Sequence, residues 1–431
     1  MTHYKLQNVA SGRIFDDTGW LLSDPLDSKP SLIRAIYEKK KFHTKKDSLD
    51  FFKYSDWLPI NRVLKNSAST ITYKSVELAK SLDLENLYIS FSGYWPEKGA
   101  KMTTCSFKET EAYSVCARLK VDSNRVMVVA SAGNTARAFA KVCSENKIPL
   151  LIVVPEDNLD ALWFDSSINE CVKLICSPSQ SDYYDAIDLA NKVCKSPKFF
   201  EEGGAKNVAR RDGMATTVLS AAATIGRIPD YYFQAIGSGT GTIAAWEANL
   251  RLIEDGRFGT HKMVLLPSQN SPFTPMYDAW KVGSRDLLQT DENEAREMAL
   301  QIGAKVLSNR RPPYAIPGGL FDALADTRGD IEIADNGEME RACDLFEKCE
   351  GIDIHPAAGI ALAGMIKSIN SGKVDREKII MLNITGGGEK RFKAENKVFY
   401  LKPNLIVDSD LEPETVPKMV ESLFSFPINN I

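Results

Sequence analysis

Residues 231–242 read Tyr231-Tyr232-Phe233-Gln234-Ala235-Ile236-Gly237-Ser238-Gly239-Thr240-Gly241-Thr242. The first six form a nearly continuous apolar run of strand length, and a helical pattern of apolar residues follows the glycines over residues 242–254. Glycines allow backbone N–H groups to turn toward a ligand without a clash from Cβ atoms, and a helix start carries partial positive charge. The stretch predicts a strand, a phosphate-binding loop and a helix.

Two other interpretations of this glycine loop stay open at this point. A simple strand-to-helix turn gives the same pattern, and a dinucleotide site is a competitor. The spacing is G-x-G-x-G and not G-x-G-x-x-G, and no acidic residue clearly ends the following strand. The Gly-Lys-Ser/Thr of a Walker loop does not occur here either.

The same alternation of strand and helix recurs along the chain. Apolar runs that are typical of strands buried on both faces occupy residues 86–91, 126–130, 150–154, 231–236, 262–266 and 379–384. Helical patterns lie between them, for example over residues 107–119, 135–145 and 182–195. This order predicts a doubly wound α/β fold with parallel sheets.

Two more polar turns follow predicted strands, where parallel sheets bind their ligands. The first reads Ser131-Ala132-Gly133-Asn134-Thr135, and the second reads Thr385-Gly386-Gly387-Gly388. Backbone N–H groups at Ser131, Ala132, Gly133 and Thr135 can bind a carboxylate, while the Asn134 amide can reach another ligand group. A helix cap by Ser131 or Asn134 is the alternative for the first turn, and a plain turn is the alternative for the second.

Lys108 adds a reactive amine to these turns. It lies in Thr104-Cys105-Ser106-Phe107-Lys108-Glu109, at the predicted start of a helix. A single lysine is ordinarily a surface residue, but these four segments occur in an order that fits pyridoxal 5'-phosphate. Lys108 would form the Schiff base, Asn134 would bind the ring hydroxyl and Thr385 the ring nitrogen. The phosphate would be bound by Gly237, Ser238, Gly239, Thr240 and Gly241.

Composition excludes several other classes of protein. The 431 residues carry a net charge of −4, so no basic footprint for nucleic acid is present. Neither a signal peptide nor an apolar run near the ~20 residues of a membrane span is found. The eight cysteines form no C-x-x-C pair, which favours reduced thiols in a cytoplasm. The four histidines do not cluster, and no metal site is predicted.

The chain resembles the fold-type II pyridoxal-phosphate enzymes of the threonine synthase family, from about Trp57 to Arg391. The segment 106–108 resembles their Schiff-base motif, 131–135 their Asn-bearing motif and 237–242 their phosphate loop. The resemblance implies a tryptophan synthase β-like fold with the cofactor between two doubly wound domains. The expected divisions are an N-terminal segment 1–55, a large domain 56–115 plus 215–431 and a smaller mobile domain 116–214. A homo-oligomer is expected.

Residues 86–109 most resemble the family members that make L-cysteate from O-phospho-L-serine and sulfite, an early step of one coenzyme M pathway. Cys105 and Glu109 stand where threonine-forming members usually have Gly and Asp. The alternatives are O-phosphohomoserine as substrate, another nucleophile such as sulfide or an amine, and a non-catalytic binding protein. Many relatives carry cysteine pairs in an N-terminal zinc ribbon, whereas residues 4–13 contain none. The segment is expected to persist without metal.

The resemblance also implies a mechanism of β-replacement. Lys108 takes the substrate's α-proton, phosphate leaves, sulfite adds to the β-carbon and Lys108 returns the proton. Two small anions must then be bound near the β-carbon. The candidate cations are Lys98, Lys101, Arg137, Arg210 and Arg211, each with an ordinary surface charge as the alternative. His355 is predicted to be structural.

Overall fold

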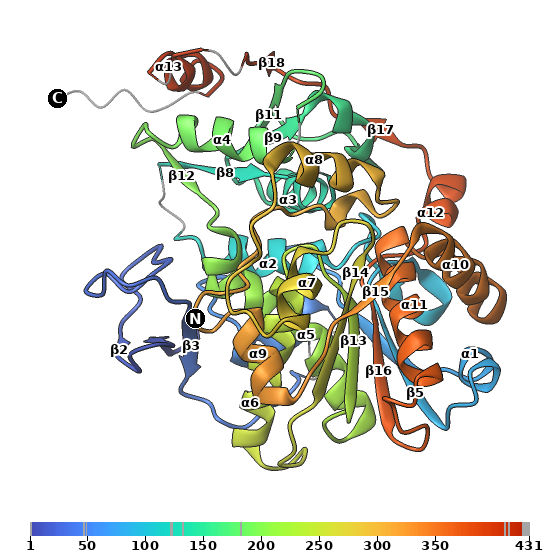
Figure 1. Cartoon of the computed structure of the whole chain (residues 1–431). Coiled ribbons are helices and arrows are strands. Elements are labelled where there is room, and N and C mark those ends of the chain that lie inside the picture. The colour runs from blue at the N-terminus through green and yellow to red at the C-terminus, as the bar shows by residue number, and fades with distance from the viewer. Residues whose placement is uncertain are drawn as a thin grey trace.

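Two sheets, each flanked by helices, build the molecule (Figure 1). The computed structural model describes residues 2–45, 48, 50–120, 124–131, 133–181, 183–408, 411–412 and 414–424. The larger sheet has the strand order β15-β14-β13-β16-β5-β4 and is parallel except for β4. Its strands are β4 Ile71–Lys74, β5 Asn86–Phe91, β13 Tyr231–Ala235, β14 Val264–Asn270, β15 Glu332–Ala334 and β16 Ile379–Ile384.

The smaller sheet is parallel throughout, in the order β12-β8-β9-β11-β18. Its strands are β8 Val126–Ala130, β9 Leu150–Pro155, β11 Val172–Ser177, β12 Phe199–Glu201 and β18 Leu405–Ile406. The predicted α/β class with parallel sheets is confirmed. β18 belongs to this sheet although residues 215–431 were assigned to the large domain. The proposed domain boundaries stay a prediction.

Helices cover both faces of the larger sheet, with α5 and α6 on one side and α10 and α11 on the other (Figure 1). Successive residues of β13 therefore face different cores, since Tyr232 packs in the first and Phe233 in the second. This two-sided burial explains the nearly continuous apolar runs. The helices are α1 Glu77–Ser81, α2 Lys108–Arg118, α3 Asn134–Asn146, α4 Tyr183–Val193, α5 Val208–Ile225, α6 Thr240–Asp255, α7 Pro275–Lys281, α8 Glu292–Gln301, α9 Leu320–Thr327, α10 Asn336–Glu350, α11 Pro356–Asn370, α12 Glu389–Glu395 and α13 Thr415–Glu421.

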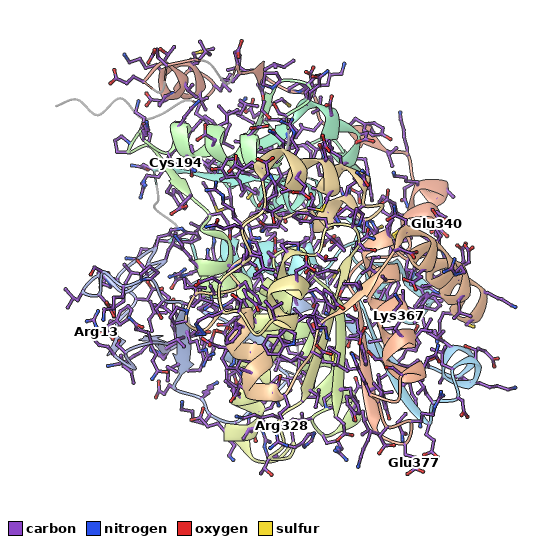
Figure 2. All side chains as sticks on the ribbon, viewed as in Figure 1. Arg13, Cys194, Arg328, Glu340, Lys367 and Glu377 are labelled. Carbon is purple, nitrogen blue, oxygen red and sulfur yellow. The ribbon has the colours of Figure 1, made fainter. Side chains whose placement is uncertain are left out.

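The N-terminal segment forms its own antiparallel sheet of three strands, β1 Tyr4–Asn8, β2 Ile14–Phe15 and β3 Ile33–Tyr37. Figure 2 labels Arg13 here, on the side of the molecule opposite Glu340 of α10. Polar contacts join this sheet to the larger body. The Tyr37 hydroxyl donates to Asp212 of α5 at 2.5 Å, and Arg34 pairs with Glu247 of α6 at 3.1 Å.

Two short ribbons complete the fold. One pairs β6 Tyr94–Trp95 with β7 Ala100–Lys101, and the other pairs β10 Trp163–Phe164 with β17 Phe399–Tyr400. Over the described ranges, none of the helices has the length and apolar character needed to cross a membrane.

Candidate active site

Lys108 is the first residue of α2, and its amine lies inside the protein. The Lys108 side chain is 21% exposed, and Nζ lies 3.2 Å from Oε2 of Glu111, one turn further along the helix. Burial lowers the pKa of the Lys108 amine and outweighs the Glu111 carboxylate, which raises it. At a given pH, a larger fraction of this amine is therefore neutral and nucleophilic than for an ordinary lysine.

The turn before Lys108 is fixed by a buried carboxylate. Glu109 accepts hydrogen bonds from the backbone N–H and the hydroxyl of Thr104, at 2.7 and 2.8 Å. Between them, Cys105 is fully buried and adopts a left-handed backbone conformation with φ of +52°. Glycine adopts such a conformation most readily. Cys105 thus lies in the turn before the lysine, and Glu109, in the first turn of α2, fixes that turn through Thr104.

The glycine loop lies at the start of α6. Gly239 has φ of +77° and precedes the helix, whose first turn has N–H groups without intrahelical acceptors. The Ser238 and Thr240 hydroxyls are 2.8 Å apart and complete the loop. A Cβ at Gly237 would lie 2.9 Å from Cα of Leu307, so the loop backbone is closely packed from behind. This geometry suits an anion that approaches the helix start.

The Asn-bearing turn orients an amide toward the same region. Oδ1 of Asn134 accepts a hydrogen bond from Arg137 at 3.0 Å, while its Nδ2 group has no protein partner within the described ranges. Gly133 occupies the cap position of α3, and within the part of the chain that the structure describes no side chain caps this helix, so the helix-cap alternative is not observed. Ser131 instead accepts from the Gly133 N–H at 3.0 Å. Thr135 is partly buried in the first turn of α3, and Ala132 lies outside the described residues.

Thr385 follows β16 and adjoins the lysine segment. Its carbonyl accepts from the Phe107 N–H at 2.9 Å, and Ser106 forms a β-bridge with Gly386. The Thr385 side chain is 8% exposed, and its hydroxyl has no partner among the residues that the structure describes. Gly388 is required by the tight turn, because its φ is +75° and a Cβ there would lie 1.9 Å from the Tyr94 carbonyl oxygen.

These segments come together around one cavity. Eight residues predicted to bind the cofactor line it, namely Lys108, Asn134, Gly237, Ser238, Gly239, Thr240, Gly241 and Thr385. Ser131, Gly133 and Thr135, which were predicted to bind the substrate, are not among its lining residues. The cavity adjoins a cleft of about 1560 Å³, and the two share Asn134, Ser238, Thr240, Val306, His355 and Ala357. The cleft is lined from both the smaller sheet and the larger body.

Two of the five candidate cations line this cleft, Arg137 and Arg210. Arg211 does not, because it is buried against Glu247 at 3.0 Å. Lys98 lies over the rings of Tyr73 and Trp95, and Lys101 is exposed on β7. Sequence reasoning missed the other cations of the cleft, which are Lys206, Arg296, Lys305, Arg310, Arg311 and Lys393.

His355 lines both the cavity and the cleft. Its Nε2 lies 2.8 Å from Oε2 of Glu389, and Arg137 lies 3.7 Å from the same oxygen. Burial raises the pKa of Glu389, but the His355 hydrogen bond and the Arg137 charge outweigh it and hold this pKa well below its usual range. The carboxylate is therefore charged at neutral pH. Its partners come from α3 and the start of α11, which no local sequence pattern could connect.

The residues present fit pyridoxal phosphate. A buried amine, the start of helix α6, an amide fixed on one side and a buried hydroxyl without a partner among the described residues all face one cavity. Each matches one polar group of the cofactor: the aldehyde, the phosphate, the ring hydroxyl and the ring nitrogen.

Comparison with known families agrees with this chemistry. Residues 98–386 match the family described as "Pyridoxal-phosphate dependent enzyme". The chain belongs to this family of enzymes. The cofactor of this pyridoxal-phosphate-dependent enzyme is accordingly pyridoxal phosphate.

Curated relatives cover nearly the whole of this pyridoxal-phosphate-dependent enzyme. The cysteate synthase of Methanosarcina acetivorans is 46% identical over 384 residues, 89% of this chain and 92% of that protein. That of Methanocella paludicola is 46% identical over 393 residues, covering 90% and 92%. That of Methanospirillum hungatei is 42% identical over 421 residues, covering 98% of both.

Solved structures share the fold at low sequence identity. Maize serine racemase superposes with a TM-score of 0.57 at 14% identity, over 76% of this chain and 92% of its own. A hydrogen sulfide-producing enzyme from Fusobacterium nucleatum gives 0.54 at 15% identity, over 74% and 95%. The predicted fold-type II architecture is confirmed.

Proposed function

We propose that this enzyme is a cysteate synthase, which converts O-phospho-L-serine and sulfite into L-cysteate and phosphate. One observation carries the proposal: the predicted lysine, amide, glycine loop and threonine line a single cavity beside a cation-lined cleft. The identity of 42–46% to cysteate synthases over most of the chain supports the substrates. Cysteate would feed an early step of coenzyme M biosynthesis.

Lys108 would hold the cofactor aldehyde, the loop 237–241 its phosphate, Asn134 its ring hydroxyl and Thr385 its ring nitrogen. When bound, the cofactor supplies an electron sink for negative charge at the substrate's α-carbon. A hydroxyl at the ring nitrogen leaves that nitrogen neutral, which suits replacement chemistry better than transamination.

The protein itself would transfer the proton of the α-carbon and bind the substrate carboxylate. Nζ of Lys108 would accept the proton of the α-carbon and later return it, acting as general base and then general acid. At the β-carbon, the C–O bond to phosphate breaks and the C–S bond to sulfite forms. Lys108 takes one proton from the α-carbon and returns one, so its own protonation state is unchanged at the end. The N–H groups of Ser131 and Gly133 already donate to the Val153 carbonyl and to Ser131 Oγ, both at 3.0 Å. Within this turn, the N–H of Thr135 would therefore bind the substrate carboxylate.

The cleft suits two anionic substrates. Among the described residues, eight basic and five acidic side chains line it, although the whole chain is negative. Arg137, one of these cations, donates to Oδ1 of Asn134 at 3.0 Å. We therefore propose that Arg137 and its neighbours receive the phosphate that leaves or the sulfite that enters.

A phosphate-release assay tests the proposal. The enzyme loaded with cofactor is given phosphoserine with sulfite, sulfide or an amine in turn, and the product is identified by mass spectrometry. Sulfite should give the fastest release and a product of the mass of cysteate. The Lys108→Ala variant should release no phosphate and should lack the Schiff-base absorption band.

The alternatives give different results in the same assay. Phosphate release from O-phosphohomoserine without any added nucleophile would instead indicate a threonine synthase. Faster release with sulfide or an amine would identify another acceptor, and no release with any substrate would favour a binding protein. A homo-oligomer and a cytoplasmic location remain predictions, the latter based on the eight cysteines, all of which are free thiols.

A further inference from the structure

Lys108 has a buried carboxylate as its neighbour. Glu111 is fully buried, and its Oε2 lies 3.2 Å from Lys108 Nζ. Its other oxygen, Oε1, lies 3.2 Å from Nη1 of Arg210. Arg210 in turn donates through Nε to Glu202 at 3.0 Å and forms a second, shorter bond with the same carboxylate. A chain of alternating charge thus leads from the amine to the wall of the cleft.

Close packing of two helices creates this chain of contacts. A Cβ at Gly213 of α5 would lie 2.3 Å from the Thr110 carbonyl oxygen of α2, so only glycine permits the observed approach. Arg210 lies about one turn before Gly213, which places its guanidinium against Glu111. Lys108 and Glu111 are themselves one turn apart on α2 and share a face of that helix.

A gain in stability does not readily explain why a charged residue, Glu111, is buried at this position. A buried ion pair is costly to desolvate, and apolar side chains of similar size often replace one without loss. Glu247 provides a comparison within this chain, because it is also buried and lies between two arginines, Arg34 and Arg211. Glu247 lines neither the cavity nor the cleft, whereas Glu111 contacts the amine that lines the cavity.

We propose that Glu111 is a positioning residue for Lys108. Its carboxylate holds the amine beside the cavity whenever the amine is not bonded to the cofactor, and it stabilises the ammonium that forms when Lys108 takes the α-proton. In that step the substrate C–H bond breaks and an N–H bond forms on Nζ, and the reverse step restores both groups. The inference rests on the proposed function in taking Lys108 as the reactive amine.

Arg210 and Glu202 support this role. Arg210 binds both carboxylates, so it fixes the Glu111 carboxylate beside Lys108 while Glu202 fixes the guanidinium. Tyr183 of α4 also faces this cluster. The charges around the amine therefore oppose one another, since Glu111 and Glu202 favour the ammonium while Arg210 and burial disfavour it. Removal of Glu111 alone takes away the nearest group that favours the charged amine.

Titration of the Lys108 amine tests the proposal without substrate. The full chain is used, after a competing amine has displaced the cofactor from Lys108 and has been removed. An amine-reactive reagent is applied over a range of pH, and modification of the Lys108 peptide is followed by mass spectrometry. The Glu111→Gln variant should lower the midpoint of this titration by roughly one to three pH units, the usual effect of one close opposite charge. The matched control Glu247→Gln removes another buried carboxylate and should leave the midpoint at its wild-type value.

A second variant covers the case in which Glu111→Gln does not fold. Glu111→Asp keeps the charge on a shorter side chain, so its midpoint should lie below that of the wild type and above that of Glu111→Gln. In the holoenzyme, kcat should fall more than KM changes in Glu111→Gln and should recover in part in Glu111→Asp. Midpoints equal to the wild type in the Glu111 variants would overturn the assignment. Wild-type protein that titrates as expected but releases no phosphate would reject only the proposed substrates.

Discussion

Cys105 adopts a left-handed backbone conformation, which is unfavourable for a residue with a side chain. Its φ of +52° costs an L-residue about 1 kcal/mol relative to glycine, and its thiol is fully buried. We expect Cys105→Gly to be more stable than Cys105→Ala by about 1 kcal/mol, because both lose the thiol but only alanine keeps the strain. Urea unfolding of the two variants measures the difference.

A helical position supplies the control for this comparison. At the buried Ala138 of α3, glycine should be less stable than the native alanine by at least ~1 kcal/mol, since helix interiors disfavour glycine. The order of alanine and glycine should therefore reverse between positions 105 and 138. The same order at both would contradict the left-handed conformation of Cys105.

Arg137 connects three parts of the site by hydrogen bonds that a lysine cannot reproduce. Its guanidinium donates to the Thr104 carbonyl at 3.0 and 3.2 Å, to Ala161 at 2.7 Å and to Asn134 at 3.0 Å. We expect Arg137→Lys to weaken cofactor binding about fivefold, because the Asn134 amide loses the bond of about 1 kcal/mol that orients it. Fluorescence titration of the cofactor measures this affinity.

Arg211→Lys is the matched control for Arg137→Lys. Arg211 is also buried and donates to backbone carbonyls, those of Ile33 and Ala205, but unlike Arg137 it does not line the cleft. Both variants should lower stability, and only Arg137→Lys should lower cofactor affinity. Equal affinities in the two variants would show that Arg137 has a purely structural role.

At the scale of residues, the sequence predicts site residues that follow a buried strand. It does not predict contacts whose partner comes from another helix. Asn134 and Thr385 were predicted because each lies in the turn after a buried strand, and the structure places both at the cavity. Arg210 and Arg211 could not be distinguished, because neighbouring residues on a helix point about 100° apart and only the packing decides which faces the cleft. Glu111 was missed because its pairing depends on burial by α5.

At the scale of elements, the N-terminal sheet is held by a buried amide. Nδ2 of Asn8 donates to Asp24 and to Asp27, both at 3.1 Å. Its Oδ1 accepts from the N–H groups of Ala10 at 2.9 Å and Ser11 at 3.2 Å. Arg13 adds a bond to Asp24 at 2.9 Å. One side chain therefore joins the turn after β1 to the loop before β3, in the segment expected to persist without metal.

We expect Asn8→Ala to weaken this sheet by about 2 to 4 kcal/mol, since it removes four hydrogen bonds and leaves buried partners unsatisfied. Hydrogen exchange of the backbone amides of β1 and β3 measures the local loss of stability. Gln7→Ala is the control, because Gln7 makes one exposed bond of 3.4 Å to Gly12. Unchanged exchange in Asn8→Ala would show that strand pairing alone holds the sheet.

Long, buried strands could be predicted from the sequence, whereas very short strands could not. Residues 86–91, 126–130 and 379–384 were predicted as strands with the bounds that the structure shows, because these runs are apolar on both faces. β12, with three residues, and β18, with two, are too short to give a periodic signal. β18 joins the smaller sheet across a long separation in sequence, which no local pattern encodes.

At the scale of the whole molecule, the charge around the cleft has the opposite sign to the net charge of the chain. The chain carries −4, yet basic side chains outnumber acidic ones around the cleft. A concave region with an excess of one charge raises the local concentration of oppositely charged ligands, and salt screens this effect over about 10 Å at 0.1 M. The composition gave no sign of this local excess, because it arises only when distant loops come together.

Two exposed lysines of the cleft, Lys206 and Lys305, allow a test of this field. We expect the double variant K206Q/K305Q to lower kcat/KM for phosphoserine and sulfite several-fold at low ionic strength, since anions are attracted less strongly. The loss should disappear as salt rises, with kcat nearly constant throughout. The control K65Q/K348Q makes the same change of charge at exposed positions outside the cleft and should leave kcat/KM unaltered. A loss that persists at high salt would indicate direct binding of substrate by these lysines instead of a long-range field.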